Sequence, residues 1–166
     1  AEAVMKKLYP VQTPEIKLFL SDIDGVLTDS GMYYSENGDE LKRFSTYDGM
    51  AFQLLKEKGI KTGLITSENR ALNKRRSEKI GVDFIFQGIK DKLSIVQEIC
   101  KNEGISLSDV AYVGDDINDK EVLEAVGYPF CPENAQQAIK EIPTIHILTK
   151  KGGEGVIREV FEFIYG

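Results

Sequence analysis

The sequence lacks the features of several specialised classes of protein. No apolar run approaches the length of a membrane span, and the first residues lack the apolar core of a signal peptide. Basic residues are fewer than acidic ones, and the net charge of -6 argues against a general nucleic-acid or membrane-surface binder. We therefore expect a cytoplasmic protein with no nucleic-acid partner and no membrane partner.

Cysteine and histidine are also scarce. The two cysteines, Cys100 and Cys131, lack metal-ligand spacing, and nothing in their placement indicates a disulfide scaffold. Reduced thiols in a cytosolic protein are the simpler interpretation. The one histidine, His146, lies in an apolar stretch at 145–148, which favours a strand residue over a catalyst.

The composition that is present is that of an ordinary globular protein. With 166 residues, 42% of them hydrophobic and 29% charged, the chain suits one domain with a substantial core. It contains no low-complexity tract and no internal repeat. Pro10 and Pro14 interrupt the start of the chain, so we expect residues 1–15 to lead into a single domain at 16–166.

Short apolar runs alternate with helical patterns along the chain. We expect strands at 16–20, 61–66, 83–87, 111–114, 128–131 and 145–148. We expect helices at 48–58, 69–80, 91–103, 119–126, 135–141 and 156–165. This alternation predicts an α/β fold, with a Rossmann-like parallel sheet covered by helices on both faces. After the first strand, Asn37-Gly38 predicts a projecting β-hairpin at about 32–45.

Polar residues that can carry chemistry follow several of the predicted strands. In chain order they are Asp22, Asp24, Thr66, Lys92, Asp115, Asp116, Asn118 and Asp119. The carboxyl ends of parallel strands meet at one edge of a sheet, where open α/β folds bind ligands, so we expect these residues to converge. Each group alone is also typical of a polar turn, but four unrelated turns explain the set poorly.

These residue types point to phosphoryl transfer to a carboxylate. Aspartate is an established nucleophile for phosphorus, and Mg²⁺, a lysine and backbone amides can neutralise the transferred group. Asp22 and Asp115 suit the small number of carboxylates that Mg²⁺ prefers, and Gly25 lets the backbone approach the substrate's anionic group. Asp24 is placed to protonate the leaving alkoxide and then to activate water.

The same residues resemble, in order, the four motifs of the haloacid dehalogenase superfamily of phosphohydrolases. The matching segments are Asp22-Ile23-Asp24-Gly25-Val26-Leu27-Thr28, Thr66, Lys92, and Gly114-Asp115-Asp116-Ile117-Asn118-Asp119. The resemblance covers the chain from about residue 16 onward. It implies that Asp22 is the nucleophile, that Asp24 is the general acid and base, and that Thr66 and Lys92 bind phosphate.

The resemblance also implies a metal site and a supporting residue. Mg²⁺ would lie on Asp22, the backbone carbonyl of Asp24 and Asp115, and Asp116 would assist at the metal. Asp119 would orient the phosphate-binding lysine.

A narrower resemblance is to the 3-deoxy-octulosonate 8-phosphate phosphatases. It rests on the short length, on a hairpin in place of a cap domain, and on the sequence Lys-Gly-Gly-Glu-Gly-Val-Ile-Arg-Glu at 151–159. On residue type alone, Gly152-Gly153 is also typical of an ordinary flexible loop. The resemblance implies a small-molecule sugar acid phosphate as substrate and a capless homotetramer whose neighbouring subunits close the site.

The loop after the second strand departs from that subfamily. The octulosonate enzymes usually have Thr-Gly-Arg, whereas this chain has Thr66-Ser67-Glu68, with Arg76 eight residues later. This pattern resembles the phosphatases of nine-carbon keto acids, the nonulosonate 9-phosphates of the sialic acid and deaminated sialic acid type. We expect Ser67 and a Glu68–Arg76 pair to bind such a substrate, with octulosonate 8-phosphate as the alternative. A surface ion pair on one helix is the other interpretation of Glu68 and Arg76.

Two other classes of protein share parts of this pattern. A receiver domain of two-component signalling also joins carboxylates, a hydroxyl and a lysine, but its phosphorylated aspartate follows a later strand, whereas here Asp22 comes first. A non-catalytic oligomerisation module of a cytidylyltransferase fusion would suit a chain that starts without methionine and is trimmed or excised from a longer one. The presence of both Asp24 and Lys92 favours an active phosphatase over that module.

Overall fold

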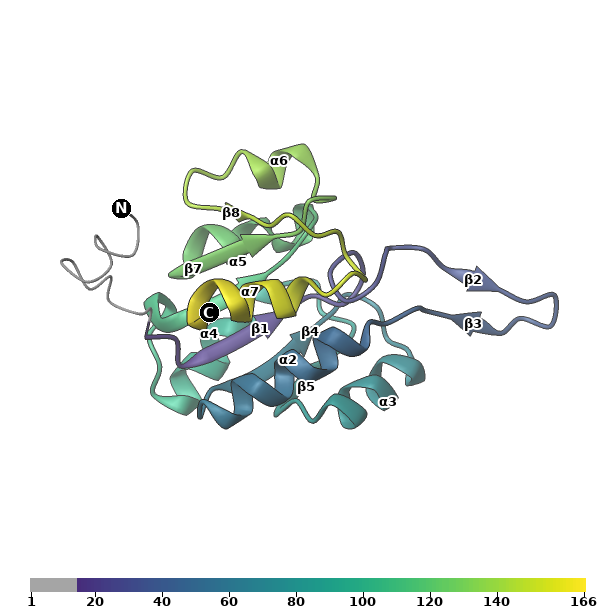
Figure 1. Ribbon diagram of the computed structural model, residues 1–166, viewed down its shortest axis with the longest axis horizontal. Coiled ribbons are helices and arrows are strands. Elements are labelled where there is room, and N and C mark those ends of the chain that lie inside the picture. Colours follow the sequence, from purple (N-terminus) through teal and green to yellow (C-terminus); the bar gives the residue numbers. More distant parts are fainter. Residues whose placement is uncertain (1–14) are drawn as a thin grey trace.

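The computed structural model describes residues 15–166 (Figure 1). The predicted lead-in at 1–15 lies outside the described residues, apart from its last position. Six parallel strands form one sheet in the order β5-β4-β1-β6-β7-β8, which confirms the predicted parallel sheet. The strands are β1 (Leu18–Ser21), β4 (Lys61–Ile65), β5 (Phe84–Phe86), β6 (Val110–Val113), β7 (Tyr128–Cys131) and β8 (His146–Ile147).

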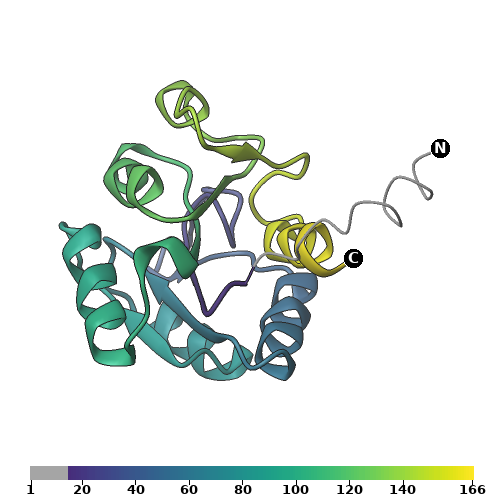
Figure 2. The same ribbon diagram turned by 90° about the vertical axis from the view of Figure 1, so that its left-hand side faces the viewer.

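Helices cover both faces of the sheet. They are α2 (Thr46–Glu57), α3 (Ala71–Ile80), α4 (Lys92–Glu103), α5 (Lys120–Ala125), α6 (Gln137–Lys140) and α7 (Val156–Tyr165), with short 3₁₀ turns η1 (Leu107–Asp109) and η2 (Ile117–Asp119). In Figure 2, α2 (blue) and α7 (yellow) lie together on one side of the sheet, and α4 and α5 (teal and green) lie on the other. In the described part of the chain, no helix is both long and apolar enough to cross a membrane.

The central strand, β1, is buried on both faces. Phe19 packs into the core on the side of α2 and α7, whereas Leu18 and Leu20 pack into the core on the side of α4 and α5. All three side chains are completely buried, as expected for a strand of a parallel sheet covered on both sides. This burial places the carboxyl end of β1 at the middle of the sheet edge.

A β-hairpin projects from that edge, where the sequence predicted one (Figure 1). We call residues 32–45 the arm; it contains β2 (Tyr33–Tyr34) paired antiparallel with β3 (Glu40–Leu41). Its turn contains Gly38 at a φ of 86°, a conformation that favours glycine. Between β1 and α2 the chain forms only this hairpin and its flanking loops, so no cap domain is inserted there.

Asp48, a buried residue of α2, ties this helix to α7. Its Oδ1 accepts a hydrogen bond of 2.8 Å from the backbone N–H of Ile157, in the first turn of α7. The residue that precedes α7, Gly155, has no side chain to cap the helix, so Asp48 supplies a cap from another element. Burial raises the pKa of Asp48 to about 6, although hydrogen bonds from the backbone N–H groups of Ile157 and Arg158 favour the charged carboxylate and so lower the pKa in part.

We predict that Asp48 makes the stability of the protein depend on pH. Because its pKa is raised by folding, its contribution is fully present below pH 3.8 and is lost as the pH rises through about 6. The change amounts to about 3 kcal/mol, because each unit of pKa shift corresponds to about 1.4 kcal/mol. Asp48→Asn keeps an oxygen for the Ile157 N–H but cannot titrate, so the variant is expected to lose this dependence.

Urea unfolding of the wild type and of Asp48→Asn at several pH values between about 4 and 7 checks this prediction. The exposed Asp39→Asn is the matched control. A difference in unfolding free energy between wild type and Asp48→Asn that stays constant with pH would contradict it.

Candidate active site

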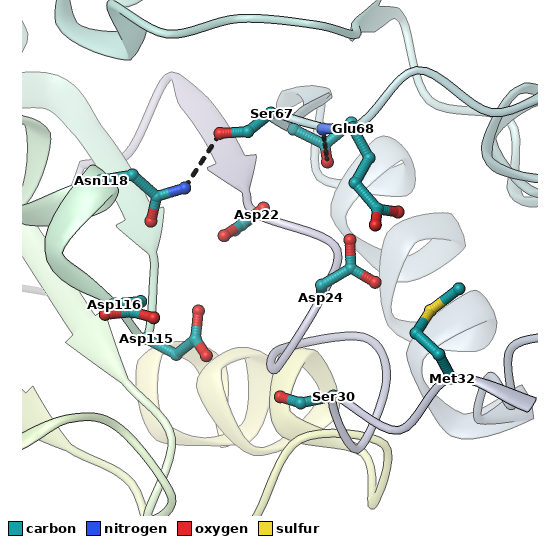
Figure 3. A pocket seen from close by; sticks show the side chains of 10 residues that line it. Asp22, Asp24, Ser30, Met32, Ser67, Glu68, Asp115, Asp116 and Asn118 are labelled. Carbon is teal, nitrogen blue, oxygen red and sulfur yellow. Dashed lines mark hydrogen bonds between the residues drawn. The ribbon is translucent and has the colours of Figure 1, made fainter.

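An open pocket of about 290 Å³ lies at the carboxyl edge of the sheet, beside the base of the arm (Figure 3). Its lining residues come from the ends of β1, β4 and β6 and from the loops that follow them: Asp22, Asp24, Ser30, Met32, Thr66, Ser67, Glu68, Asp115, Asp116 and Asn118. The structure therefore brings together most of the residues that the sequence predicted to converge.

Asp22 lies at the floor of this pocket, directly after β1. Its backbone N–H extends the sheet by donating to the carbonyl of Val113 over 3.0 Å, which fixes its height at the sheet edge. Its Oδ1 accepts from the N–H of Ile23 at 2.7 Å, and its Oδ2 lies 3.1 Å from the Nζ of Lys92. One carboxylate oxygen is thus held by backbone and the other by an ammonium group.

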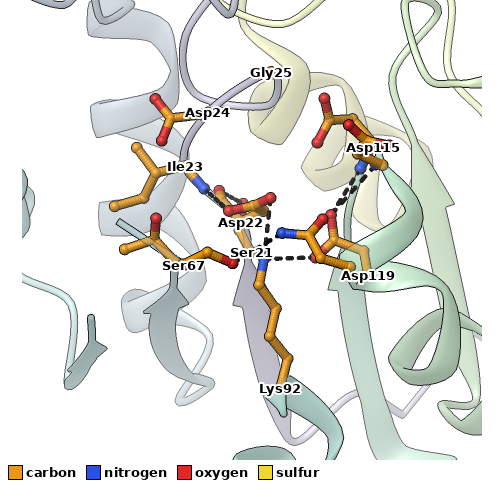
Figure 4. A network of polar contacts seen from close by, with 12 residues as sticks. Ser21, Asp22, Ile23, Asp24, Gly25, Ser67, Lys92, Asp115 and Asp119 are labelled. Carbon is orange, nitrogen blue, oxygen red and sulfur yellow. Dashed lines mark hydrogen bonds and ion pairs between the residues drawn. The ribbon is translucent and has the colours of Figure 1, made fainter. Parts of the chain in front are cut away.

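Lys92 and Asp119 form the buried support beneath Asp22 (Figure 4). Lys92 is the first residue of α4, and its Nζ lies 2.8 Å from the Oδ1 of Asp119. That same oxygen accepts a hydrogen bond of 2.6 Å from the hydroxyl of Tyr112. Burial alone would lower the pKa of Lys92, but the charges of Asp22 and Asp119 more than offset it, so its pKa is raised and the ammonium is kept.

Three buried carboxylates, those of Asp22, Asp115 and Asp119, are close enough to hold one metal ion, with one oxygen from each within 4.8 Å of the others. The second oxygen of Asp119 accepts from the backbone N–H groups of Asp115 and Asp116, at 3.1 and 3.5 Å. Both Asp119 oxygens therefore have partners already. Asp22 and Asp115, unlike Asp119, line the pocket and can face a cation there, and Asp116 lies exposed beside them with its Oδ1 accepting from the N–H of Ile117.

The charges of this cluster fit a divalent cation. Burial, together with the neighbouring charge of Asp119, raises the pKa of Asp22 well above its ordinary value. Burial likewise raises the pKa of Asp115 to about 7, with Asp119 and Asp116 adding to the effect. Three carboxylates share one ammonium, that of Lys92, so a hard cation with oxygen ligands would compensate the remaining charge.

The side chain of Asp24 points away from Asp22 and toward Glu68 (Figure 3). Its Oδ1 lies 2.8 Å from the Nζ of Lys42, a residue that directly follows β3 of the arm. The same Nζ pairs with the Oε2 of Glu68 at 2.5 Å. Lys42 is a residue of the site that the sequence reasoning missed, because no motif marks it.

The opposite wall of the pocket comes from the loop after β4. The Oγ1 of Thr66 accepts from the N–H of Glu68 at 3.2 Å, and the threonine is buried. Asn118 donates from its Nδ2 to the Oγ of Ser67 at 3.0 Å, which joins this loop to the one after β6. Ser67 thus lines the pocket and contacts a residue of another predicted motif.

Gly152-Gly153 packs against the loop that follows Asp22. The N–H of Gly153 donates to the carbonyl of Val26 at 3.2 Å, and Asn134 bridges the two segments. Its Nδ2 donates to the carbonyl of Gly25 at 3.1 Å, and its Oδ1 accepts from the N–H of Gly152 at 2.7 Å. A Cβ at position 152 would lie 2.2 Å from the Gly25 carbonyl oxygen, so this segment is a fitted support for the site and not an ordinary flexible loop.

The predicted Glu68–Arg76 pair is wrong. Glu68 lies in the loop before α3, which begins at Ala71, and its carboxylate pairs with Lys42 and not with Arg76. Arg76 instead donates from its Nη2 to the carbonyl of Ser45 at 2.9 Å. It is not among the residues that line the pocket of Asp22.

Three supporting residues were not found from the sequence: Lys42, Tyr112 and Asn134. Tyr112 carries the one signal that was available, a hydroxyl in the middle of an otherwise apolar strand that precedes a carboxylate motif. Such a hydroxyl is buried only with a partner. The other two lie far along the chain from the residues they contact, so only the fold reveals them.

Comparison with known proteins agrees with this geometry. The model of the haloacid dehalogenase-like hydrolase family matches residues 56–160, and the chain belongs to this family. The 3-deoxy-D-manno-octulosonate 8-phosphate phosphatase KdsC of Haemophilus influenzae is 30% identical over 149 residues, which is 90% of this chain and 82% of the relative. KdsC of Escherichia coli K12 is 33% identical over 150 residues, or 90% of this chain and 79% of the relative.

The solved structures place the chain more narrowly within the family. The 3-deoxy-D-manno-octulosonate 8-phosphate phosphatase of Moraxella catarrhalis, a complex with magnesium ion, phosphate ion and KDO, has a TM-score of 0.88 and 37% identity. The match covers 96% of this chain and 91% of that one. The likeness to the capless octulosonate-phosphatase subfamily is therefore confirmed, and the chain is a phosphatase by family.

We predict that divalent cations bind this site more weakly as the pH falls. Because the pKa of Asp115 is raised to about 7, the carboxyl keeps its proton at lower pH, and a cation must displace it. Affinity for Mg²⁺ should therefore rise roughly tenfold per pH unit for each proton displaced, and level off above about pH 7. Titration calorimetry with MgCl₂ between about pH 5 and 8 measures this slope. Asp115→Asn should bind weakly, and an affinity of the wild type that does not change with pH would refute the prediction.

Proposed function

We propose that the protein is a Mg²⁺-dependent phosphatase that removes phosphate from a 2-keto-3-deoxy sugar acid through an aspartyl-phosphate on Asp22. The observation that carries the proposal is the placement of Asp22, buried at the sheet edge between the Lys92 ammonium and the Asp115 carboxylate. An anionic phosphoryl group can approach the Asp22 carboxylate only when the Lys92 ammonium and a bound divalent cation together offset the charge of the neighbouring carboxylates.

In the proposed mechanism, an oxygen of Asp22 attacks phosphorus while the bond from phosphorus to the sugar oxygen breaks. Asp24 gives its proton to the leaving alkoxide, and the freed sugar acid departs. Water then attacks the aspartyl-phosphate, Asp24 takes up its proton, and Asp22 is regenerated with release of inorganic phosphate. Lys92 and the hydroxyl of Thr66 hold the phosphoryl oxygens. Asp22, the Asp24 carbonyl and Asp115 would hold Mg²⁺, which would supply charge neutralisation.

The first substrate candidate is 3-deoxy-D-manno-octulosonate 8-phosphate. It is supported by the relatives from Haemophilus influenzae and Escherichia coli, which are phosphatases of this compound and align with 90% of the chain. It is also supported by the Moraxella catarrhalis structure, which holds magnesium, phosphate and KDO in the same fold.

The second candidate is a nine-carbon nonulosonate 9-phosphate. The observation that favours it is the Ser67-Glu68 segment, which lines the pocket where the octulosonate enzymes usually have Gly-Arg. A carboxylate at this point would accept hydrogen bonds from substrate hydroxyl or amide groups. Arg76 lies outside this pocket and has no part in the second candidate.

We further propose that the protein assembles as a homotetramer. Tyr33, Tyr34 and Leu41 on the projecting arm are exposed, and large apolar side chains gathered on a protruding hairpin are typical of an association surface. Sedimentation of the full chain is expected to give four subunits. A monomer at micromolar concentration would exclude this assembly.

The substrate proposal is tested by phosphate release from the octulosonate 8-phosphate and from nonulosonate 9-phosphates, side by side and with Mg²⁺. One carbon length is expected to be preferred by roughly tenfold or more in kcat/KM. Asp22→Asn should lower turnover of every substrate by more than roughly a thousandfold while the melting temperature is retained. Release from none of the compounds by the wild type, or full activity of Asp22→Asn, would refute the proposed function.

A further inference from the structure

Among the described residues of the arm, Lys42 is the only one that forms ion pairs with carboxylates of the pocket. Its Nζ lies 2.8 Å from Asp24 and 2.5 Å from Glu68, and 3.4 Å from the Oδ1 of Asn73. The side chain is covered, although the backbone stands at the base of a projecting hairpin. One ammonium therefore bridges the end of β1 to the loop after β4.

The placement of this ammonium is restrained from two sides. The Oε2 of Glu40, two residues earlier, pairs with the Nε of Arg70 at 2.9 Å, which ties the arm to the residue before α3. A covered ammonium cannot find water in place of its partners, so Lys42 is held on its two carboxylates. Burial would lower the pKa of Lys42, but hydrogen bonds to Asp24 and Glu68 more than offset it, and the group stays charged.

We propose that Lys42 is a positioning residue for the phosphatase reaction, which holds the Asp24 carboxyl where it can exchange a proton with the leaving oxygen. The proposal rests on the proposed function, in which Asp24 is the general acid and base. It adds a role for a residue that lies outside every motif of the chain.

The charges around the pocket explain why such a residue is needed. Five of its lining residues are carboxylates: Asp22, Asp24, Glu68, Asp115 and Asp116. Lys92 pairs with Asp22 at the floor of the pocket, whereas Asp24 and Glu68 both pair with Lys42. Without the ammonium, two like charges at the mouth would repel each other, and the Asp24 side chain would lose the contact that sets its direction.

Leaving-group dependence separates this role from a merely structural one. A sugar alkoxide leaves only with a proton, whereas p-nitrophenolate leaves readily without one. Lys42→Met keeps the length and apolar stem of the side chain but removes the charge. Because Asp24 also activates water in the second step, which is common to both substrates, the readout is the first turnover, in which the sugar acid or p-nitrophenolate leaves before the aspartyl-phosphate is hydrolysed. We expect the rate of this first turnover to fall roughly a hundredfold with octulosonate 8-phosphate and less than about fivefold with p-nitrophenyl phosphate.

Two further variants complete the experiment. Lys42→Arg retains a cation that can reach both carboxylates, so it should recover most of the lost first-turnover rate with the sugar acid phosphate. Arg43→Met removes a charge from the next, exposed position of the arm and should behave like the wild type. Melting temperatures of all three variants report on the fold.

The outcomes that would overturn the inference are distinct. An equal loss of first-turnover rate with both substrates would make Lys42 a structural residue. A raised KM with unchanged kcat would make it a substrate-binding residue. Failure of the proposed function itself is recognised separately, because Asp22→Asn would then stay active with either substrate.

Discussion

The structure depends on one buried ionic arrangement, in which the Lys92 ammonium lies between Asp22 and Asp119 at distances of 3.1 and 2.8 Å. Carboxylates crowded in a buried place repel one another and resist ionisation. The Lys92 ammonium offsets part of this repulsion, and the Tyr112 hydroxyl and backbone N–H groups donate hydrogen bonds to the oxygens of Asp119. The remaining negative charge makes the site suited to a cation and then to a phosphate ester, so its electrostatics and its chemistry have the same origin.

The parallel sheet is what makes this arrangement possible. Because β1 is buried on both faces between β4 and β6, its carboxyl end lies beside theirs, and three loops meet above it. Asn134 and Gly152-Gly153, which come later in the chain, support the loop that follows β1. The arm then brings Lys42 to the mouth, so the absence of a cap domain does not leave Asp24 without a partner.

Most of the fold could be predicted, because the spacing of apolar residues and the glycines and prolines that end helices and strands are local features of the sequence. Gly81 and Gly104 take up left-handed conformations where α3 and α4 end, as glycines after helical patterns predict. The error at Glu68 and Arg76 came from contacts with the arm, because Glu68 pairs with Lys42 and Arg76 donates to the carbonyl of Ser45. Both of these partners lie far from Glu68 and Arg76 in the sequence, so no local pattern indicates them.

By itself, the sequence determined the parallel fold and the residues that directly follow its strands, including Asp22, Thr66 and Asp115. Topology brings such residues together whatever their side-chain contacts are. Only the tertiary structure decided that Lys42 joins Asp24 to Glu68, that Asn134 bridges Gly25 and Gly152, and that Asp48 caps α7. These contacts join residues far apart in the chain, and their distances are set by how helices and loops pack on the sheet, which no local pattern records.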